Sequence, residues 1–156
     1  MSQTPYPLII DGHNDTVLSL LTPNASRRRT FFEKSSRGHV DLPRAIEGGL
    51  GGGFFAVFIP PAKHRSNSAI RATNVEDAKL PPPLDPAYAA RFAMKGLAKL
   101  LEVEKESDGQ VRVVRTVGDL QSCLDENVLA MILHFEGAEA IDTDLDSLDV
   151  FYAAGL

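Results

Sequence analysis

The sequence predicts an α/β protein built on a parallel β-sheet. Three short segments are apolar along their whole length, and polar or helix-forming stretches separate them. Strands without hydrophobic alternation indicate a sheet that is covered on both faces, and helices between strands indicate parallel crossover connections. The strands are expected at Leu8–Ile10, Phe54–Ile59 and Val128–Leu133.

One short helix is predicted between the first two strands. Asp41–Glu47 can form it, because Asp41 can cap its N-terminus and Pro43 suits its first turn. Upstream, the polar stretch Thr22–Gly38 is expected to cross the surface as a loop or a short helix, with its arginine triplet in solvent. The glycine-rich residues 48–53 predict a flexible turn that leads into the second strand.

A proline-rich stretch separates the second strand from the helix with the strongest pattern. The stretch runs from about residue 60 to residue 84 and holds five of the ten prolines of the chain. A connection of this length is usually functional or disordered, so a lid and an insertion are both open. Asp85 and Pro86 then open a helix, because a capping acceptor precedes a proline and apolar residues follow at helical spacing up to Leu101.

Three further elements complete the pattern. Val111–Arg115 is expected to be extended, and Thr116 with Asp119 resembles a capping box that opens a helix. This helix carries Cys123, which we expect to be a small buried residue rather than a nucleophile. After the third strand, apolar residues outline a last helix that closes at Gly155.

The composition excludes several classes of protein. The 156 residues are 44% hydrophobic and 24% charged, as in a globular domain, and the formal net charge of -5 argues against nucleic acid as a partner. A single cysteine allows neither a disulfide framework nor a cysteine-rich zinc knuckle, which fits a reducing compartment. The first ten residues lack a basic region and a long apolar run. We therefore expect a cytoplasmic chain without a membrane segment.

Two strand ends carry residues that can bind a metal. Side chains alternate along a strand, so Asp11, His13 and Asp15 are expected to project the same way from the end of the first strand. Glu136 follows the third strand, and the carboxyl ends of parallel strands meet at one edge of a sheet. An isolated His-x-Asp more often hydrogen-bonds a turn, and an isolated glutamate before a glycine more often caps a helix. Together, the two motifs favour a metal site.

Four motifs in order and spacing resemble the membrane (renal) dipeptidase family. The resemblance covers nearly the whole chain, except for the proline-rich stretch, which is longer than the family usually carries. It is specific because four separate landmarks agree. The motifs are Asp11-Gly12-His13-Asn14-Asp15, His39-Val40-Asp41-Leu42-Pro43, the run from Gly48 to Phe58, and Glu136-Gly137-Ala138.

The resemblance implies a binuclear zinc hydrolase on a (β/α)8 barrel that cleaves the peptide bond of small dipeptides. His13 and Asp15 match ligands of one zinc ion, and Glu136 matches the catalytic carboxylate that bridges both ions. A bridging water or hydroxide is then the nucleophile, so that no serine or cysteine is required. Members of the family can form homodimers. Another binuclear metal amidohydrolase is the alternative, but such enzymes commonly begin with His-x-His rather than His-x-Asp.

The resemblance reaches only the N-terminal portion of the family. A complete (β/α)8 barrel needs about 250 residues, so we expect one partial barrel domain over residues 1–156, with a loop or insertion at about 60–84. The remaining zinc and substrate ligands are expected beyond Leu156. The alternative to an enzyme is therefore a truncated, non-catalytic fragment, and we expect the chain alone to be inactive and poorly soluble.

The other three histidines are not predicted to bind metal. His134 departs from the family pattern, which has a small or apolar residue two positions before the bridging glutamate. It shares the strand face of Glu136, and we expect it to pack beside or support the site rather than to bind metal. His39 and His64 lie in predicted loops and are expected to be solvated.

Overall fold

The protein forms one parallel sheet of four strands. The computed structural model describes residues 8–21, 29–62 and 82–156. The strand order is β1-β2-β4-β3, and every neighbouring pair is parallel, which confirms the predicted α/β class. The strands are β1 (Ile9–Asn14), β2 (Leu50–Phe58), β3 (Val111–Val113) and β4 (Leu129–Glu136).

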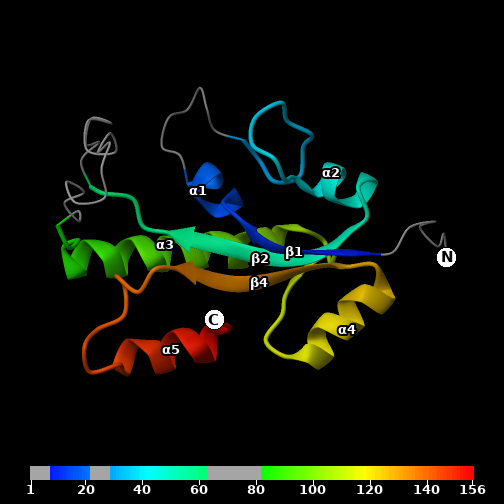
Figure 1. Ribbon diagram of the computed structural model, residues 1–156. Coiled ribbons are helices and arrows are strands. Elements are labelled where there is room, and N and C mark those ends of the chain that lie inside the picture. Colours follow the sequence, from blue (N-terminus) through cyan, green and yellow to red (C-terminus); the bar gives the residue numbers. More distant parts are fainter. Residues whose placement is uncertain (1–7, 22–28, 63–81) are drawn as a thin grey trace, which may run out of the picture.

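Five helices flank this sheet in the described part of the chain. Figure 1 shows β1, β2 and β4 side by side, with α1 and α2 beside the β1 edge, α4 and α5 beside the β4 edge, and α3 behind the strands. No helix of the described residues is long and apolar enough to cross a membrane. The helices are α1 (Thr16–Leu20), α2 (Leu42–Glu47), α3 (Pro86–Glu106), α4 (Val117–Glu126) and α5 (Asp146–Ala154).

The larger core lies between one face of the sheet and helices α1, α2, α3 and α5. Helix α3 lies directly on β2, because a Cβ atom at Gly96 would lie only 2.6 Å from Cγ1 of Val57. Its residues Leu97 and Leu100 are buried in this core. Each buried leucine contributes about 1.5–3 kcal/mol to the free energy of unfolding. The close contact and the buried leucines therefore fix α3 against the sheet.

A smaller core covers only the beginning of the opposite face. There, Cys123 of α4 packs with Val114 and with Ala130 of β4. Burial raises the pKa of the Cys123 thiol, which confirms the expectation of a small buried residue rather than a nucleophile. Further along the same face, β4 presents His134 and Glu136. The face that α4 covers at one end thus carries polar residues at the other.

Local capping signals confirm the predicted helices. The Asp41 carboxylate accepts a hydrogen bond from the backbone N–H of Arg44 at 3.0 Å and caps α2. Asp85 caps α3 in the same way, and Thr116 with Asp119 forms the expected capping box of α4. Helix α5 ends at Gly155, whose φ of 115° is in the left-handed region.

The predicted flexible turn at residues 48–53 is wrong from Leu50 onward, because β2 begins there. Only Gly48 and Gly49 form the turn, and Gly49 has a φ of 70°. The glycines that follow are buried within the strand, where they allow close packing. A Cβ atom would lie 2.7 Å from Cδ2 of Leu124 at Gly51, and 2.8 Å from Cβ of Ala130 at Gly52.

Helix α1 was not predicted, and Arg29 is not solvated as the arginine triplet was expected to be. Its Nε and one terminal nitrogen donate to Oγ of Ser19 in α1, at 3.2 and 2.9 Å. Burial lowers the pKa of the Arg29 guanidinium. The other two arginines, His64 and most of the proline-rich stretch lie outside the described residues, whereas His39 is exposed as expected.

Candidate metal centre

Three of the predicted ligands meet at the carboxyl ends of β1 and β4. Nε2 of His13 lies 3.8 Å from Oδ1 of Asp15 and 3.5 Å from Oε2 of Glu136. One ligand atom of each residue lies within 4.8 Å of the others, and this is the one such group among the residues that the structure describes. The sheet therefore brings together side chains that are more than 120 positions apart in the sequence.

A network of hydrogen bonds holds the segment that carries His13 and Asp15. The carboxylate of Asp11 accepts from the backbone N–H of His13 at 3.3 Å and from Nδ2 of Asn14 at 3.0 Å. Nδ2 of Asn14 also donates to the carbonyl oxygen of Phe54 at 3.2 Å. Its Oδ1 accepts from the backbone N–H at the start of α1 at 3.3 Å. Asn14 thus connects β1, β2 and α1 beside the ligands.

Asp11 was expected to project the same way as His13 and Asp15, but it does not join them in the ligand group. The pairing of β1 with β2 shifts register between Asp11 and Asn14, so strict alternation of side chains ends there. Asp11 is not part of the ligand group, and its carboxylate instead stabilises the turn. Asn14 was missed by sequence reasoning. The signal that indicates it is a side-chain amide three residues after a carboxylate at the end of a strand.

Glu136 is presented by the abrupt end of β4. It is the last residue of the strand, and Gly137 follows with a φ of 97°. A residue with a side chain rarely adopts this left-handed conformation, so the glycine allows the chain to turn directly after the carboxylate. The Glu136 side chain is consequently 46% exposed, compared with 42% for His13. All three candidate ligands are exposed to solvent.

The donor set fits a divalent metal ion such as zinc. It consists of one imidazole nitrogen and two carboxylates, which are ordinary zinc ligands. Two donors bound tetrahedrally at about 2.1 Å from a metal are separated by about 3.4 Å. The separations of 3.5 and 3.8 Å around His13 are near this value. They are longer than the N···O distance of about 2.9 Å in a typical hydrogen bond.

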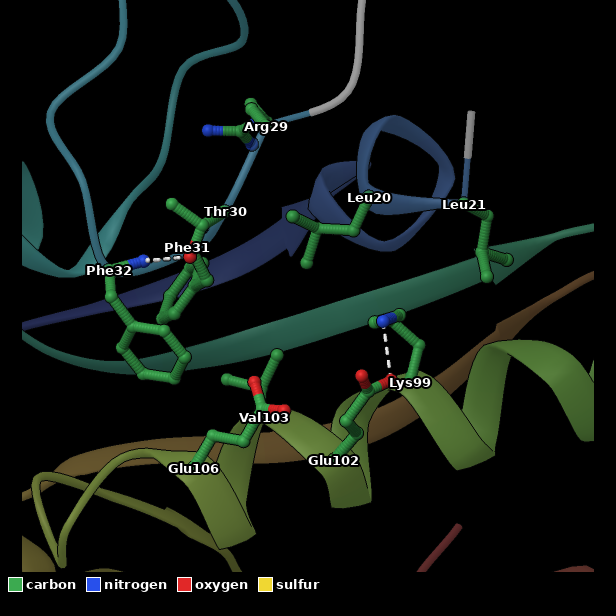
Figure 2. A pocket seen from close by; sticks show the side chains of 10 residues that line it. All are labelled: Leu20, Leu21, Arg29, Thr30, Phe31, Phe32, Lys99, Glu102, Val103 and Glu106. Carbon is green, nitrogen blue, oxygen red and sulfur yellow. Dashed lines mark hydrogen bonds and ion pairs between the residues drawn. The ribbon is translucent and has the colours of Figure 1, made fainter. Parts of the chain in front are cut away.

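A separate groove lies away from this centre. Its volume is about 630 Å³, and it lies between the end of α1, residues 29–32 and the C-terminal half of α3. Figure 2 shows its lining, in which Lys99 and Glu102 pair on α3. None of the three candidate ligands lines the groove. The candidate metal centre is therefore identified by its donor atoms and not by this groove.

A parallel sheet with candidate metal ligands at the carboxyl ends of its strands is typical of metal-dependent proteins of the α/β barrel class. The model of one family, described as membrane dipeptidase (peptidase family M19), matches residues 4–156. The chain belongs to the membrane dipeptidase family.

Two solved structures support the assignment of the fold. Dipeptidase AC, a metallopeptidase of family M19, is 37% identical, with a TM-score of 0.78, and the match covers 96% of this chain and 40% of that one. A metallopeptidase from Rhodobacter sphaeroides, solved with a phosphinate mimic of the dipeptide L-Ala-D-Ala, is 38% identical, with a TM-score of 0.80 and coverage of 96% and 43%. The fold is thus the N-terminal part of a TIM-type barrel, as the resemblance implied.

A curated relative from Acinetobacter calcoaceticus, "Uncharacterized protein in PQQ-III 3'region", matches over nearly the same range. It is 33% identical over 153 residues, which are 95% of this chain and 46% of the relative. The chain therefore spans less than half the length of each of these three proteins.

Proposed function

We propose that this chain carries the metal-binding part of the active site of a zinc-dependent dipeptidase. The observation that carries the proposal is the convergence of His13, Asp15 and Glu136 at the carboxyl ends of two strands. Membership of the membrane dipeptidase family supports it. The dipeptide mimic bound to the Rhodobacter sphaeroides relative supports dipeptides as the substrate class.

His13, Asp15 and Glu136 would hold one zinc ion, and Glu136 would also be a ligand of a second ion in the complete family site. Bound zinc supplies Lewis-acid polarisation of the peptide carbonyl and activation of water. The chain supplies the arrangement of the ligands. Asp11 and Asn14 hold the segment that bears His13 and Asp15, and the turn at Gly137 exposes Glu136. Preorganised ligands bind metal without a further cost of ordering.

The described chain offers no competing cysteine nucleophile at this centre. Cys123 is its one cysteine and is buried between α4, to which it belongs, and the start of the sheet face. Burial raises the pKa of its thiol and disfavours the reactive thiolate. A mechanism that uses metal-activated water is consistent with this arrangement.

Hydrolysis of L-Ala-D-Ala, followed by the release of free alanine, tests the proposal. In a chain of the relatives' full length that carries these residues, we expect hydrolysis that requires added zinc and stops with a chelator, whereas this chain alone is expected to be inactive. Glu136→Gln should lower the rate on the order of 100-fold or more, because it removes a carboxylate charge from the metal centre. Glu106→Gln is the matched control, because Glu106 is exposed at the C-terminal end of α3, far from the carboxyl ends of the strands.

Zinc-independent hydrolysis, or full activity in Glu136→Gln, would contradict the proposed site. Zinc binding without hydrolysis of any dipeptide would support the metal centre and contradict catalysis by this chain alone. The same preparation used for the assay should therefore be titrated with zinc.

A further inference from the structure

The side chain of His134 lies beside the candidate metal centre but does not belong to the ligand group. It comes from β4, two residues before Glu136, and pairs in register with Ala56 of β2. His13 approaches from β1, on the other side of β2. Because the Ala56 methyl group is small, imidazoles from the two flanking strands can meet across β2. Their ring centroids are 5.3 Å apart, and their planes are inclined at 81°.

A third ring supports His134 from β2. The ring of Phe54 lies 6.0 Å from that of His134, at an angle of 89°. Both contacts have the edge-to-face geometry that aromatic rings prefer. The three rings therefore form a row that crosses three strands. The row runs from Phe54 through His134 to His13, whose Nε2 is the candidate donor to the metal.

The usual support for a metal-binding histidine is absent from the described part of the chain. Such a histidine ordinarily donates the N–H of its other ring nitrogen to a carboxylate or a carbonyl oxygen, which fixes the orientation of the ring. Among the described residues, Nδ1 of His13 has no such acceptor. The imidazole is also 42% exposed. Besides the contacts of Nε2 with Asp15 and Glu136, the edge-to-face contact with His134 limits rotation of this ring.

We propose that His134 is a positioning residue that orients the His13 imidazole toward the metal. This inference rests on the proposed metal centre. His134 acts through ring packing, and it neither binds the metal nor donates a hydrogen bond to His13. The position needs an aromatic ring on this face of β4, whereas the nitrogen atoms of His134 are dispensable for this role.

Three substitutions separate ring packing from the other roles that a histidine can have. His134→Ala removes the ring, His134→Gln keeps polar atoms without a ring, and His134→Phe keeps a ring without polar atoms. Binding of Co²⁺ to the full chain, by calorimetry and by its visible absorption spectrum, is the readout. Thermal unfolding without metal shows whether each variant folds, so that a structural defect is recognised independently.

We expect His134→Ala and His134→Gln to weaken Co²⁺ binding about three- to tenfold, the effect of losing one aromatic contact. His134→Phe should bind within about twofold of the original chain, because the edge-to-face contact is restored. The Co²⁺ absorption bands should keep their positions in His134→Phe, since the ligand set is unchanged.

Four results would overturn the inference. The first is binding of Co²⁺ by His134→Ala as tight as by the original chain. The second is restored binding in His134→Gln alone, which would indicate a polar role. The third is a loss of about 100-fold in affinity in all three variants, as expected for a metal ligand. A shift of the absorption bands in His134→Phe would also indicate ligation. His13→Ala serves as a separate control, because undiminished binding in that variant would contradict the proposed metal centre itself.

Discussion

Asp41 shows what a single buried carboxylate contributes to the free energy of unfolding, away from the candidate centre. It is fully buried and accepts hydrogen bonds from the backbone N–H groups of Ser35 and Arg44, both at 3.0 Å, and from Nε of Arg44 at 2.8 Å. Asp41→Ala leaves these donors unpaired. We expect the free energy of unfolding to fall by about 2–3 kcal/mol, measured by urea denaturation. A loss no larger than that of Asp85→Ala, at an exposed cap, would contradict this account.

The lowered pKa of Asp41 predicts that the stability of the protein depends on pH. Burial opposes ionisation of Asp41, but the hydrogen bonds from Arg44 and Ser35 outweigh it and lower the pKa of the carboxyl group. A lowered pKa gives stability that is present above the unfolded-state value of about 3.9 and is lost as the pH falls through the folded-state value. The stability difference between the original chain and Asp41→Asn should therefore shrink from pH 7 to pH 3. A stability difference that is the same at pH 7 and pH 3, measured by urea denaturation, would contradict this prediction.

Sequence reasoning reached the three candidate ligands but not the residues that hold them. His13, Asp15 and Glu136 could be predicted because polar residues at the ends of apolar strands are a local pattern. The roles of Asp11 and Asn14 depend on a register shift in β1, which no periodic pattern in the sequence indicates. Whether the three ligands bind zinc stays a prediction.

The element β2 depends on its glycines for packing rather than for flexibility. At Gly52, an added Cβ atom would lie 2.8 Å from Cβ of Ala130 and 2.9 Å from its carbonyl oxygen. Backbone cannot move aside cheaply, so Gly52→Ala should lower the free energy of unfolding by about 1–3 kcal/mol. Thermal and urea unfolding measure the change.

Gly118 in α4 provides a matched control for this prediction. The nearest atom to an added Cβ is Oγ1 of Thr116 at 3.6 Å, which is an ordinary contact. Alanine is favoured over glycine in a helix, so Gly118→Ala should stabilise the protein by about 0.5–1 kcal/mol. Equal effects of the two substitutions would contradict the packing role of Gly52.

The elements that could be predicted are those with local signals. Helices α2, α3 and α4 could be predicted because each has capping residues at its first turn. The start of β2 could not be predicted, because a run of glycines by itself indicates a turn. The reason for these glycines is their close packing against Ala130 and Leu124, which only the structure shows. The short helix α1 lacks a side-chain cap, so its sequence gave no comparable signal.

For the whole molecule, β1 forms an edge of the described sheet and exposes apolar side chains. Ile9 is 55% exposed and Ile10 is 40% exposed. Exposed apolar edges promote association, so we expect the chain to form oligomers or aggregates at micromolar concentration. Ile9→Lys should reduce this association in light scattering. Val117→Lys is the control, since Val117 is 84% exposed on α4 away from this edge, and a monomeric original chain would contradict the prediction.

Zinc titration of the full chain by calorimetry tests the central claim most directly. We predict one zinc ion per chain, with affinity reduced on the order of 100-fold in His13→Ala and Glu136→Gln, because each removes a ligand. His39→Ala and Glu106→Gln should bind like the original chain, since both residues are exposed outside the ligand group. Unchanged affinity in His13→Ala would contradict the assignment of the metal centre.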